Sequence, residues 1–207
     1  MKILVLAPHT DDGELGAGGS LARFIRTGHD VYYVAFSTAD KSVPPEFSPH
    51  VLSEEVTAAT AVLGIPSTNV RISNFEVRDF PAKRQAILEV MVGLQRELDP
   101  DMVLLPNTND SHQDHQTIAS EGFRAFKHST ILGYELPSNS TAFASDAFVV
   151  LTSDDLDYKL AALSEYKSQA HRPAIAPQFI EALARVRGCQ VGAEFAEAFE
   201  VVRWVMR

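Results

Sequence analysis

Residues 2–37, KILVLAPHTDDGELGAGGSLARFIRTGHDVYYVAFS, determine the fold that the sequence predicts. The apolar run 2–7 predicts a buried strand, residues 18–27 predict a helix that Gly28 ends, and residues 31–37 predict a second strand. A strand, a loop, a helix and a strand in this order begin a parallel sheet. We therefore expect an α/β fold.

The remainder of the chain continues this alternation of strands and helices. The apolar pattern predicts helices over residues 52–63, 82–98, 113–126 and 155–166, and strands over residues 70–72, 102–105, 131–134, 148–151 and 199–205. Residues 39–50 predict a polar loop that faces the substrate, because loops of this length are uncommon without a function. With no repeat or linker, we expect one domain over residues 1–207, with a mostly parallel sheet and helices on both faces.

The composition limits the classes of function. The chain has 207 residues, 45% of them hydrophobic, and no apolar segment approaches the roughly 18 residues that span a bilayer. The first apolar run is too short for a signal peptide, so we expect a cytoplasmic protein. The 27 acidic residues outnumber the 18 basic ones and are dispersed, which argues against nucleic acid or an anionic membrane as a partner. This charge favours a small neutral or cationic ligand, although a local Arg could bind one anionic group.

Two clusters of histidines and carboxylates follow predicted strands, at residues 8–12 (PHTDD) and 112–115 (HQDH). Each cluster holds two potential ligands three residues apart, which on one helical turn face the same side. Both clusters lie beyond the carboxyl end of a strand, the edge at which open α/β sheets bind ligands. Imidazole and carboxylate are zinc ligands in hydrolytic sites, where three protein ligands leave one position for water. The clusters therefore predict a metal-dependent hydrolase.

The same clusters contain candidate acid and base groups. His9 and Asp12 can bind one ion from a tight turn, while Asp11 points elsewhere and is free to act as a general base on a metal-activated water. In the second cluster one histidine can complete the metal site. The other can donate a proton if a carboxylate holds its ring and favours the imidazolium, and Asp114 is the candidate for that carboxylate.

Each motif alone has a more ordinary explanation. A lone His-x-x-Asp is commonly an N-cap or a surface pair, and a lone His-x-x-His is more often solvated, so their shared sheet edge is what favours a metal site. Gly13, Gly16, Gly18 and Gly19 could form a phosphate-binding loop, but their spacing is not G-x-G-x-x-G and the adjacent carboxylates would repel phosphate. We expect these glycines to allow close packing of helix on strand. Cys189, the single cysteine, is expected to be buried.

Together, residues 8–12, 18–19 and 112–115 resemble the LmbE-like/PIG-L family of zinc-dependent N-acetylglucosaminyl deacetylases. The resemblance continues in order over nearly the whole chain, through segments 54–64, 159–169 and 196–199. It implies a Rossmann-like sheet and one zinc ion per chain, with other divalent metals as alternatives. The metal ligands that it implies are His9, Asp12 and His115. The catalytic residues that it implies are Asp11 as general base, His112 as general acid and Asp114, which orients His112.

The chain departs from the family pattern at two places. Thr10 stands where the family commonly has Pro, which should change the stiffness of the turn more than metal binding. Residues 50–53 lack the Arg that holds the sugar in family members acting on glucosamine conjugates. We therefore expect free N-acetylglucosamine to be a poor substrate. The basic residues that could replace the missing Arg are Arg71, Arg78, Arg172 and Lys41.

We accordingly expect a hydrolase that removes an acyl group, in the first place acetyl, from the nitrogen of an amino sugar or its conjugate. One alternative is an amidase for a non-sugar conjugate. Another is a metal- or sugar-binding domain without turnover, which is disfavoured because binding alone requires neither Asp11 nor His112. The expected partner is a small N-acetylated molecule, and a homo-oligomer is compatible with the sequence.

Overall fold

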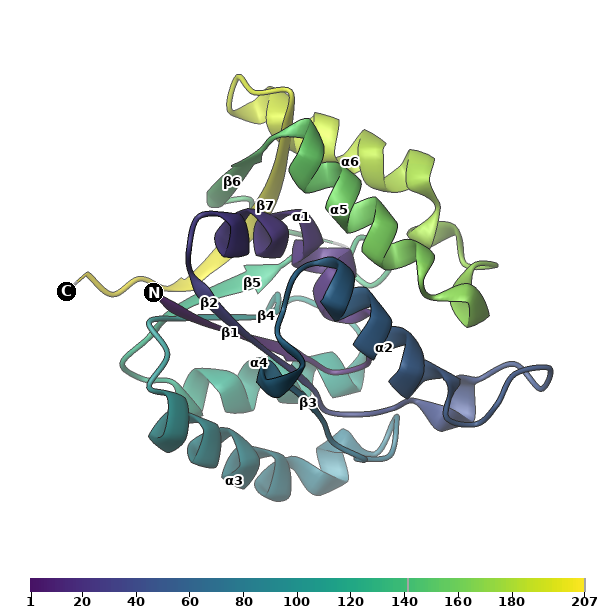
Figure 1. Ribbon diagram of the computed structural model, residues 1–207. Coiled ribbons are helices and arrows are strands. Elements are labelled where there is room, and N and C mark those ends of the chain that lie inside the picture. The colour runs from purple at the N-terminus through teal and green to yellow at the C-terminus, as the bar shows by residue number, and fades with distance from the viewer. Residues whose placement is uncertain (141, 207) are drawn as a thin grey trace.

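The computed structural model describes residues 1–140 and 142–206, and within them the chain forms a sheet of seven strands. The strands are β1 (Lys2–Ala7), β2 (Asp30–Ala35), β3 (Val70–Ile72), β4 (Met102–Pro106), β5 (Thr130–Tyr134), β6 (Ala147–Leu151) and β7 (Phe195–Arg203). Their order is β3-β2-β1-β4-β5-β7-β6 (Figure 1). Neighbours from β3 to β5 pair in parallel, whereas β7 runs antiparallel to β5 and β6. The predicted α/β fold with a mostly parallel sheet is confirmed.

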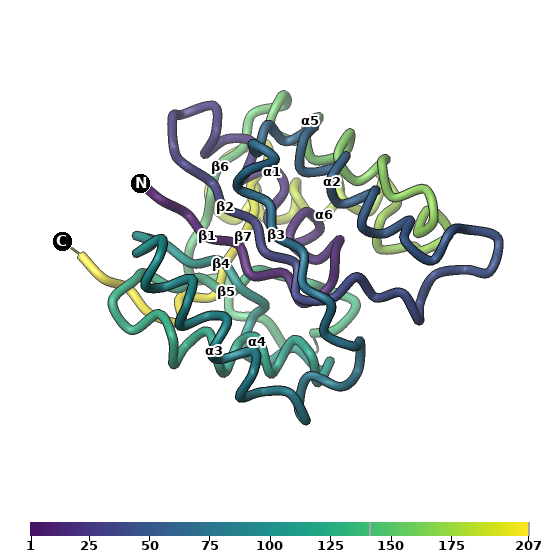
Figure 2. The backbone as a smooth tube through the Cα atoms, turned by 60° about the horizontal axis from the view of Figure 1, so that its bottom comes forward, coloured from purple at the N-terminus to yellow at the C-terminus, as the bar shows by residue number. Residues whose placement is uncertain are grey.

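Helices cover both faces of the sheet. They are α1 (Asp12–Arg26), α2 (Val51–Val62), α3 (Phe80–Leu98), α4 (Gln113–Ala125), α5 (Ser153–Ser164) and α6 (Pro177–Gln190). Helices α3 and α4 lie on one face, and α1, α2, α5 and α6 lie on the other (Figure 1, Figure 2). Strand β1 is buried between these layers: Ile3, Val5 and Ala7 pack toward α1, and Leu4 and Leu6 pack toward α3. Burial on both faces explains why this strand is a continuous apolar run.

Helix α1 begins at Asp12, well before the predicted start at residue 18. Its first turns contain glycines, which lower the intrinsic preference for a helix. A Cβ atom at Gly13 would lie 2.5 Å from the ring of Tyr33, and one at Gly16 would overlap the ring of Tyr134. These glycines therefore allow close packing of α1 on the sheet, as predicted, and this packing stabilises a helix start that sequence preference alone disfavours.

The C-terminal part of the chain differs most from the sequence prediction. Helix α6 is not predicted by the apolar pattern, because its buried residues form only a narrow stripe of Ile180, Ala184 and Gly188. The prediction that Cys189 is buried is wrong, since this residue follows the stripe and faces solvent. Strand β7 begins at Phe195 rather than at residue 199.

None of the described helices combines the length and the apolar composition that a membrane crossing requires.

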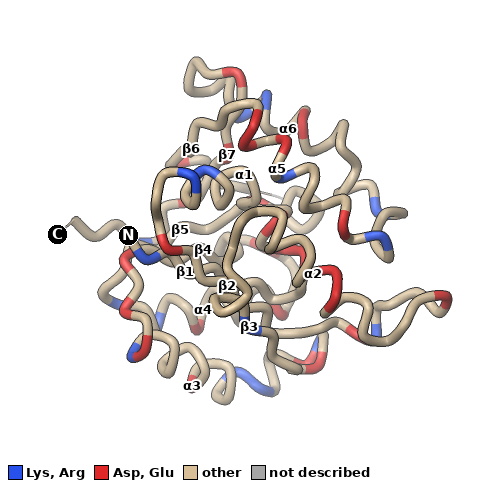
Figure 3. The backbone as a smooth tube through the Cα atoms, viewed as in Figure 1, with Lys and Arg blue, Asp and Glu red and all other residues tan. Residues whose placement is uncertain are grey.

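The strand order brings the two sequence clusters together. Strand β1 lies between β2 and β4 and pairs in parallel with both. The chain first builds the sheet from β1 toward β3 and then returns to add β4 on the other side, so the strand order reverses between β1 and β4. The turns at residues 8–11 and 107–112 follow the carboxyl ends of these two strands. Acidic and basic residues are spread over the surrounding elements (Figure 3).

Candidate active site

The turn after β1 provides the first half of the site. His9 lies in this turn, and its backbone N–H donates a hydrogen bond to Asp12 Oδ2 at 2.8 Å. Asp12 is the first residue of α1, where the helix dipole favours a negative charge. The hydrogen bond and the helix start together hold the His9 and Asp12 side chains next to each other.

The loop after β4 provides the second half. His112 is the N-cap of α4, and its Nδ1 accepts a hydrogen bond from the backbone N–H of Asp114 at 3.1 Å. Asp110 Oδ1 accepts a hydrogen bond from the His112 backbone N–H at 2.8 Å. His115 lies in the first turn of α4 and is only 1% exposed. The helix start thus places both histidines on the side facing β1.

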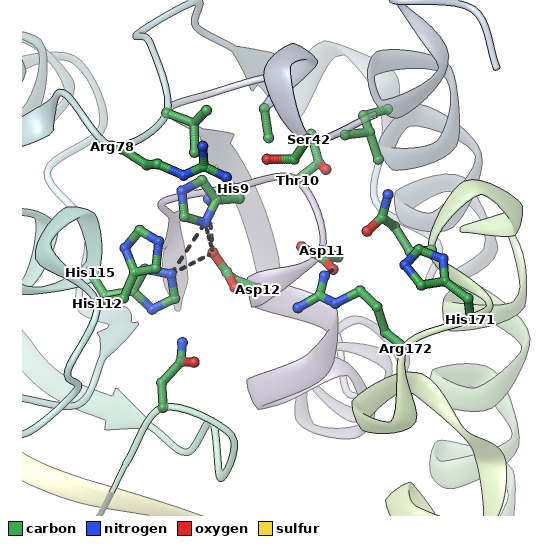
Figure 4. A pocket seen from close by; sticks show the side chains of 15 residues that line it. His9, Thr10, Asp11, Asp12, Ser42, Arg78, His112, His115, His171 and Arg172 are labelled. Carbon is green, nitrogen blue, oxygen red and sulfur yellow. Dashed lines mark hydrogen bonds and ion pairs between the residues drawn. The ribbon is translucent and has the colours of Figure 1, made fainter. Parts of the chain in front are cut away.

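Three donor atoms from these two segments converge (Figure 4). His9 Nδ1 lies 3.1 Å from Asp12 Oδ2, His115 Nε2 lies 3.3 Å from the same oxygen, and the two nitrogens are 3.2 Å apart. Ligands of a tetrahedral zinc ion, with bonds of about 2.0–2.1 Å, lie about 3.3–3.4 Å from one another. This ligand triangle, formed by His9, Asp12 and His115, therefore has the size and the donor chemistry that zinc or a similar divalent metal requires.

His112 lies beside the ligand triangle and offers an alternative donor set. The ligand atoms of His112, His9 and His115 all lie within 4.8 Å of one another. The set that contains Asp12 is more compact, and its distances match a single zinc ion more closely. Burial and the neighbouring His115 and His9 lower the pKa of His112, and the Asp114 amide at Nδ1 also favours the neutral ring. The surroundings of His112 therefore disfavour the predicted imidazolium.

A buried carboxylate supports the second ring nitrogen of each histidine in the triangle. Asp110 Oδ2 lies 2.8 Å from His115 Nδ1, and Asp114 Oδ2 lies 3.0 Å from His9 Nε2. Such a carboxylate holds the N–H of the ring and directs the lone pair of the other nitrogen toward a metal. Asp114 Oδ2 is 4.0 Å from His112 Nδ1, so this carboxylate lies closer to His9 than to His112, and the backbone N–H of Asp114 makes the shorter contact with the His112 ring. That Asp114 orients His112 stays a prediction.

These carboxylates make the site favourable for positive charge. Burial opposes the charged form of His9, but Asp114 and Asp12 outweigh it and raise the pKa of His9 to about 9. Burial opposes the charge on His115 as well, and there Asp12 and Asp110 raise the pKa to about 10. Burial also disfavours ionised Asp12, yet His115 and His9 hold the pKa of this carboxyl well below its usual range. An electrostatic potential that favours protonated imidazoles also favours a divalent cation.

Asp11 lies outside the donor set of the ligand triangle, lines the same cavity and contacts Arg172 (Figure 4). Asp11 Oδ2 accepts a hydrogen bond from Arg172 Nη1 at 2.6 Å, an ion pair between residues 161 positions apart in the sequence. Burial and the charge of Asp12 raise the pKa of Asp11, and Arg172 opposes this rise. An arginine therefore holds Asp11, whereas the sequence predicts a free carboxylate.

A buried network below the turn contains Glu14, to which the sequence assigns no role. The Glu14 carboxyl contacts the hydroxyls of Tyr33 and Tyr166, which lie 2.9 and 2.7 Å from the backbone carbonyl oxygen of Thr10. Burial raises the pKa of Glu14 to about 8, so its neutral carboxyl can donate one of these hydrogen bonds. The network anchors Thr10 and with it the turn that carries the site.

A cavity of about 310 Å³ opens beside the ligand triangle. Ala39 and Ser42 line it, so the beginning of the loop over residues 39–50 borders the site. That this loop contacts the substrate stays a prediction. The segment 169–172 forms another part of the lining. Only the family resemblance of residues 166–169 and the basic character of Arg172 mark this segment in the sequence. The volume is typical of a site for a small molecule.

Comparisons with known proteins agree on one family. The sequence model of PIG-L, described as GlcNAc-PI de-N-acetylase, matches residues 4–126. The protein described as uncharacterized deacetylase YaiS from Escherichia coli (strain K12) is 30% identical over 171 residues, which cover 80% of this chain and 90% of that protein. Diacetylchitobiose deacetylase from Thermococcus kodakarensis is 23% identical over 224 residues, which cover 97% of this chain and 83% of that protein.

The fold comparison extends over almost every element. The crystal structure of the conserved protein TT1542 from Thermus thermophilus has a TM-score of 0.81 and 26% sequence identity, and the match covers 99% of this chain and 96% of that chain. This similarity confirms the Rossmann-like fold. The matched range 4–126 contains both sequence clusters and hence every residue of the ligand triangle. The chain therefore belongs to the PIG-L (LmbE-like) family of deacetylases.

Proposed function

We propose that this protein is a metal-dependent hydrolase that removes the acetyl group from the nitrogen of an amino sugar or an amino-sugar conjugate. The observation that carries the proposal is the ligand triangle of His9, Asp12 and His115 at the edge of a cavity of about 310 Å³. Zinc, one ion per chain, is the metal that we expect, and other divalent metals suit the same donors.

The three residues of the triangle would hold the metal, and Asp110 and Asp114 would keep the imidazole rings aligned. When bound, a divalent metal supplies a water nucleophile at neutral pH and polarises the amide carbonyl. The cavity brings the substrate amide to this point.

Asp11 takes the proton of the attacking water in the proposed reaction. Its carboxyl is buried, adjoins the triangle in sequence, and has a raised pKa, which brings its proton affinity closer to that of a base at neutral pH. Arg172 binds Oδ2 and thereby fixes the side chain. This arrangement leaves Oδ1 to accept the proton.

His112 acts on the leaving nitrogen. It lines the cavity on the opposite side of the triangle from Asp11 (Figure 4). The Asp114 amide occupies Nδ1, so Nε2 is the atom available to the substrate. In the proposed reaction His112 donates its Nε2 proton to the leaving nitrogen as the C–N bond breaks. This step requires the imidazolium, so the ring must take up a proton at Nδ1 and give up its contact with the Asp114 amide.

The substrate class is supported by the family and by one relative. The PIG-L description names a de-N-acetylase, and the Thermococcus kodakarensis relative is named for diacetylchitobiose. A site of this volume accommodates a small acetylated molecule. An amidase for a non-sugar conjugate is the alternative, because the same residues would cleave any amide that fits the cavity. A cytoplasmic location stays a prediction from the sequence.

Mass spectrometry tests this proposal. The metal-loaded protein is incubated with N-acetylglucosamine, N-acetylated glycosides, nucleotide sugars and N-acetylated amino acids, and we expect loss of one acetyl group from a sugar compound. The Asp11→Asn protein, loaded with metal in the same way, is the control that lacks the base. Cleavage of the amino acids alone would favour the amidase, and the absence of cleavage in every compound would refute the proposed function.

A further inference from the structure

The four basic residues that could bind an anionic part of the substrate differ in whether they line the cavity and in whether a carboxylate already binds them. Arg71 Nη1 donates a hydrogen bond to Glu97 Oε2 at 2.8 Å on the surface, and Lys41 forms an ion pair with Glu76. Neither basic residue lines the cavity beside the ligand triangle. Their charges are therefore already balanced by carboxylates outside the site.

Arg172 and Arg78 do line the cavity, but their surroundings differ. Arg172 is the partner of Asp11. Within residues 1–140 and 142–206, the Arg78 guanidinium has no carboxylate partner, and it lies at the edge of the cavity near the His9 ring (Figure 4). Arg78 therefore supplies an unbalanced positive charge at the mouth of the site.

The backbone of Arg78 is held in an unusual conformation. Its φ angle is 72°, in the left-handed region that side chains other than glycine rarely adopt. Its N–H donates a hydrogen bond to Asp114 Oδ2 at 2.6 Å. Such strained backbone persists where surrounding contacts hold it, and it gathers at ligand-binding sites. The Arg78 side chain consequently starts from a fixed point next to the ligand triangle.

The other cavity charges do not compensate Arg78. The two carboxylates that line the cavity are Asp11, which binds Arg172, and Asp12, which contacts His9 and His115. Leu52, in the segment 50–53 that lacks the family's Arg, adds an apolar surface to the cavity. In a chain with a net charge of −9, an unpaired guanidinium directed at a cavity is a specific feature rather than part of a basic surface.

We infer that Arg78 binds an anionic group, a phosphate or a carboxylate, that the acetylated substrate carries. This inference rests on the proposed function and narrows its substrate class. The planar guanidinium matches both groups, because it can donate two parallel hydrogen bonds to their oxygens. Arg78 is thus a residue that determines substrate specificity, separate from the groups that act on the amide.

Steady-state kinetics on matched substrates test the role of Arg78. The probes are the neutral methyl glycoside of N-acetylglucosamine, its carboxymethyl glycoside and N-acetylglucosamine 1-phosphate, which separate a carboxylate from a phosphate. We expect kcat/KM of the wild type to be at least about tenfold higher for one anionic probe than for the neutral one. Arg78→Gln should lower this ratio by about ten- to a hundredfold, and Arg78→Lys should restore part of it.

The control is Arg96→Gln, which removes an exposed arginine of α3 that does not line the cavity and should keep the wild-type ratio. A wild-type preference for the neutral probe, or an equal loss on all probes in Arg78→Gln, would overturn the inference. If no probe is cleaved, the wider panel of N-acetylated compounds described above decides the proposed function, and calorimetry of the three probes tests Arg78 separately. Tighter binding of an anionic probe that Arg78→Gln abolishes supports the inference, and binding that this variant leaves unchanged overturns it.

Discussion

Replacement of Asp110 by Asn changes one oxygen of the proposed metal site into an NH₂ group. Asp110 is 1% exposed, and its two oxygens have different partners. Oδ2 lies 2.8 Å from His115 Nδ1, and Oδ1 accepts the His112 backbone N–H at 2.8 Å. For His115 Nε2 to bind a metal, Nδ1 must carry the proton and needs an acceptor. An Asn side chain offers a single acceptor for these two donors.

In one orientation the NH₂ group of Asn faces the N–H at His115 Nδ1, and in the other it faces the backbone N–H of His112, so two hydrogen-bond donors oppose each other in both. One buried hydrogen bond is lost, at a cost of about 1–3 kcal/mol, or the His115 ring adopts the wrong tautomer. Loss of such a supporting carboxylate lowers metal affinity by about ten- to a hundredfold. For a domain of this size each kcal/mol also lowers Tm by about 2–4 °C.

Competition with a chromogenic zinc chelator measures the affinity, and thermal unfolding measures the stability. Asp155→Asn is the matched control, because Asp155 is a buried carboxylate that caps α5 and binds Arg26 outside the site. We expect this control to lose stability and to keep its zinc affinity. If Asp110→Asn binds zinc as tightly as the wild type, His115 does not use Nε2 as a ligand supported by Asp110, and the reasoning fails.

Three further outcomes test the rest of the site and the fold. Under competition with a chelator, His115→Ala should lose its zinc, whereas His112→Ala should keep it, because His112 lies outside the ligand triangle. Metal analysis of both variants measures this, and zinc loss in both would favour the set of three histidines as ligands. Asp11→Asn should keep its zinc, and its kcat should fall by about a hundred- to ten-thousandfold while KM changes less. A kcat near that of the wild type would exclude Asp11 as the general base. Gly16→Ala should lower the free energy of unfolding in urea by about 1–3 kcal/mol, since its Cβ would overlap Tyr134, whereas Gly93→Ala, whose Cβ meets no neighbour, should not.

The sequence predicts those parts of the fold in which the local apolar pattern and the order of strands and helices indicate the same structure. The unbroken apolar run of β1 and the alternation of strands with helices predict a parallel sheet, and such a sheet brings its carboxyl ends to one edge. The placement of β7 between β5 and β6 has no local signal, because it depends on pairing between distant segments. The start of α1 was hidden by glycines whose packing against the sheet outweighs their low helix preference.

The candidate site also has features that the local sequence predicts and features that depend on contacts between distant segments. Spacing within each short cluster predicts His9 with Asp12 and His112 with His115 as candidate ligand pairs, and the family resemblance is what favours His115 over His112. The contacts that define how these groups behave join distant segments: Asp114 with His9 across 105 residues and Arg172 with Asp11 across 161 residues. No spacing rule predicts such contacts. The sequence therefore predicts the ligands more completely than the charge states and hydrogen bonds around them.

Asp114 Oδ2 links the proposed metal site to the proposed specificity residue. This one oxygen lies 3.0 Å from His9 Nε2 and accepts the Arg78 backbone N–H at 2.6 Å. The carboxylate that aligns His9 thus also holds the strained backbone from which the Arg78 side chain extends. Because both contacts use the same atom, the point from which the Arg78 side chain extends is held close to the ligand triangle, so an anionic group bound by Arg78 would lie within one side-chain length of that point. Arg78→Gln removes the guanidinium while keeping the backbone N–H, so it separates the binding of the anion from the alignment of His9.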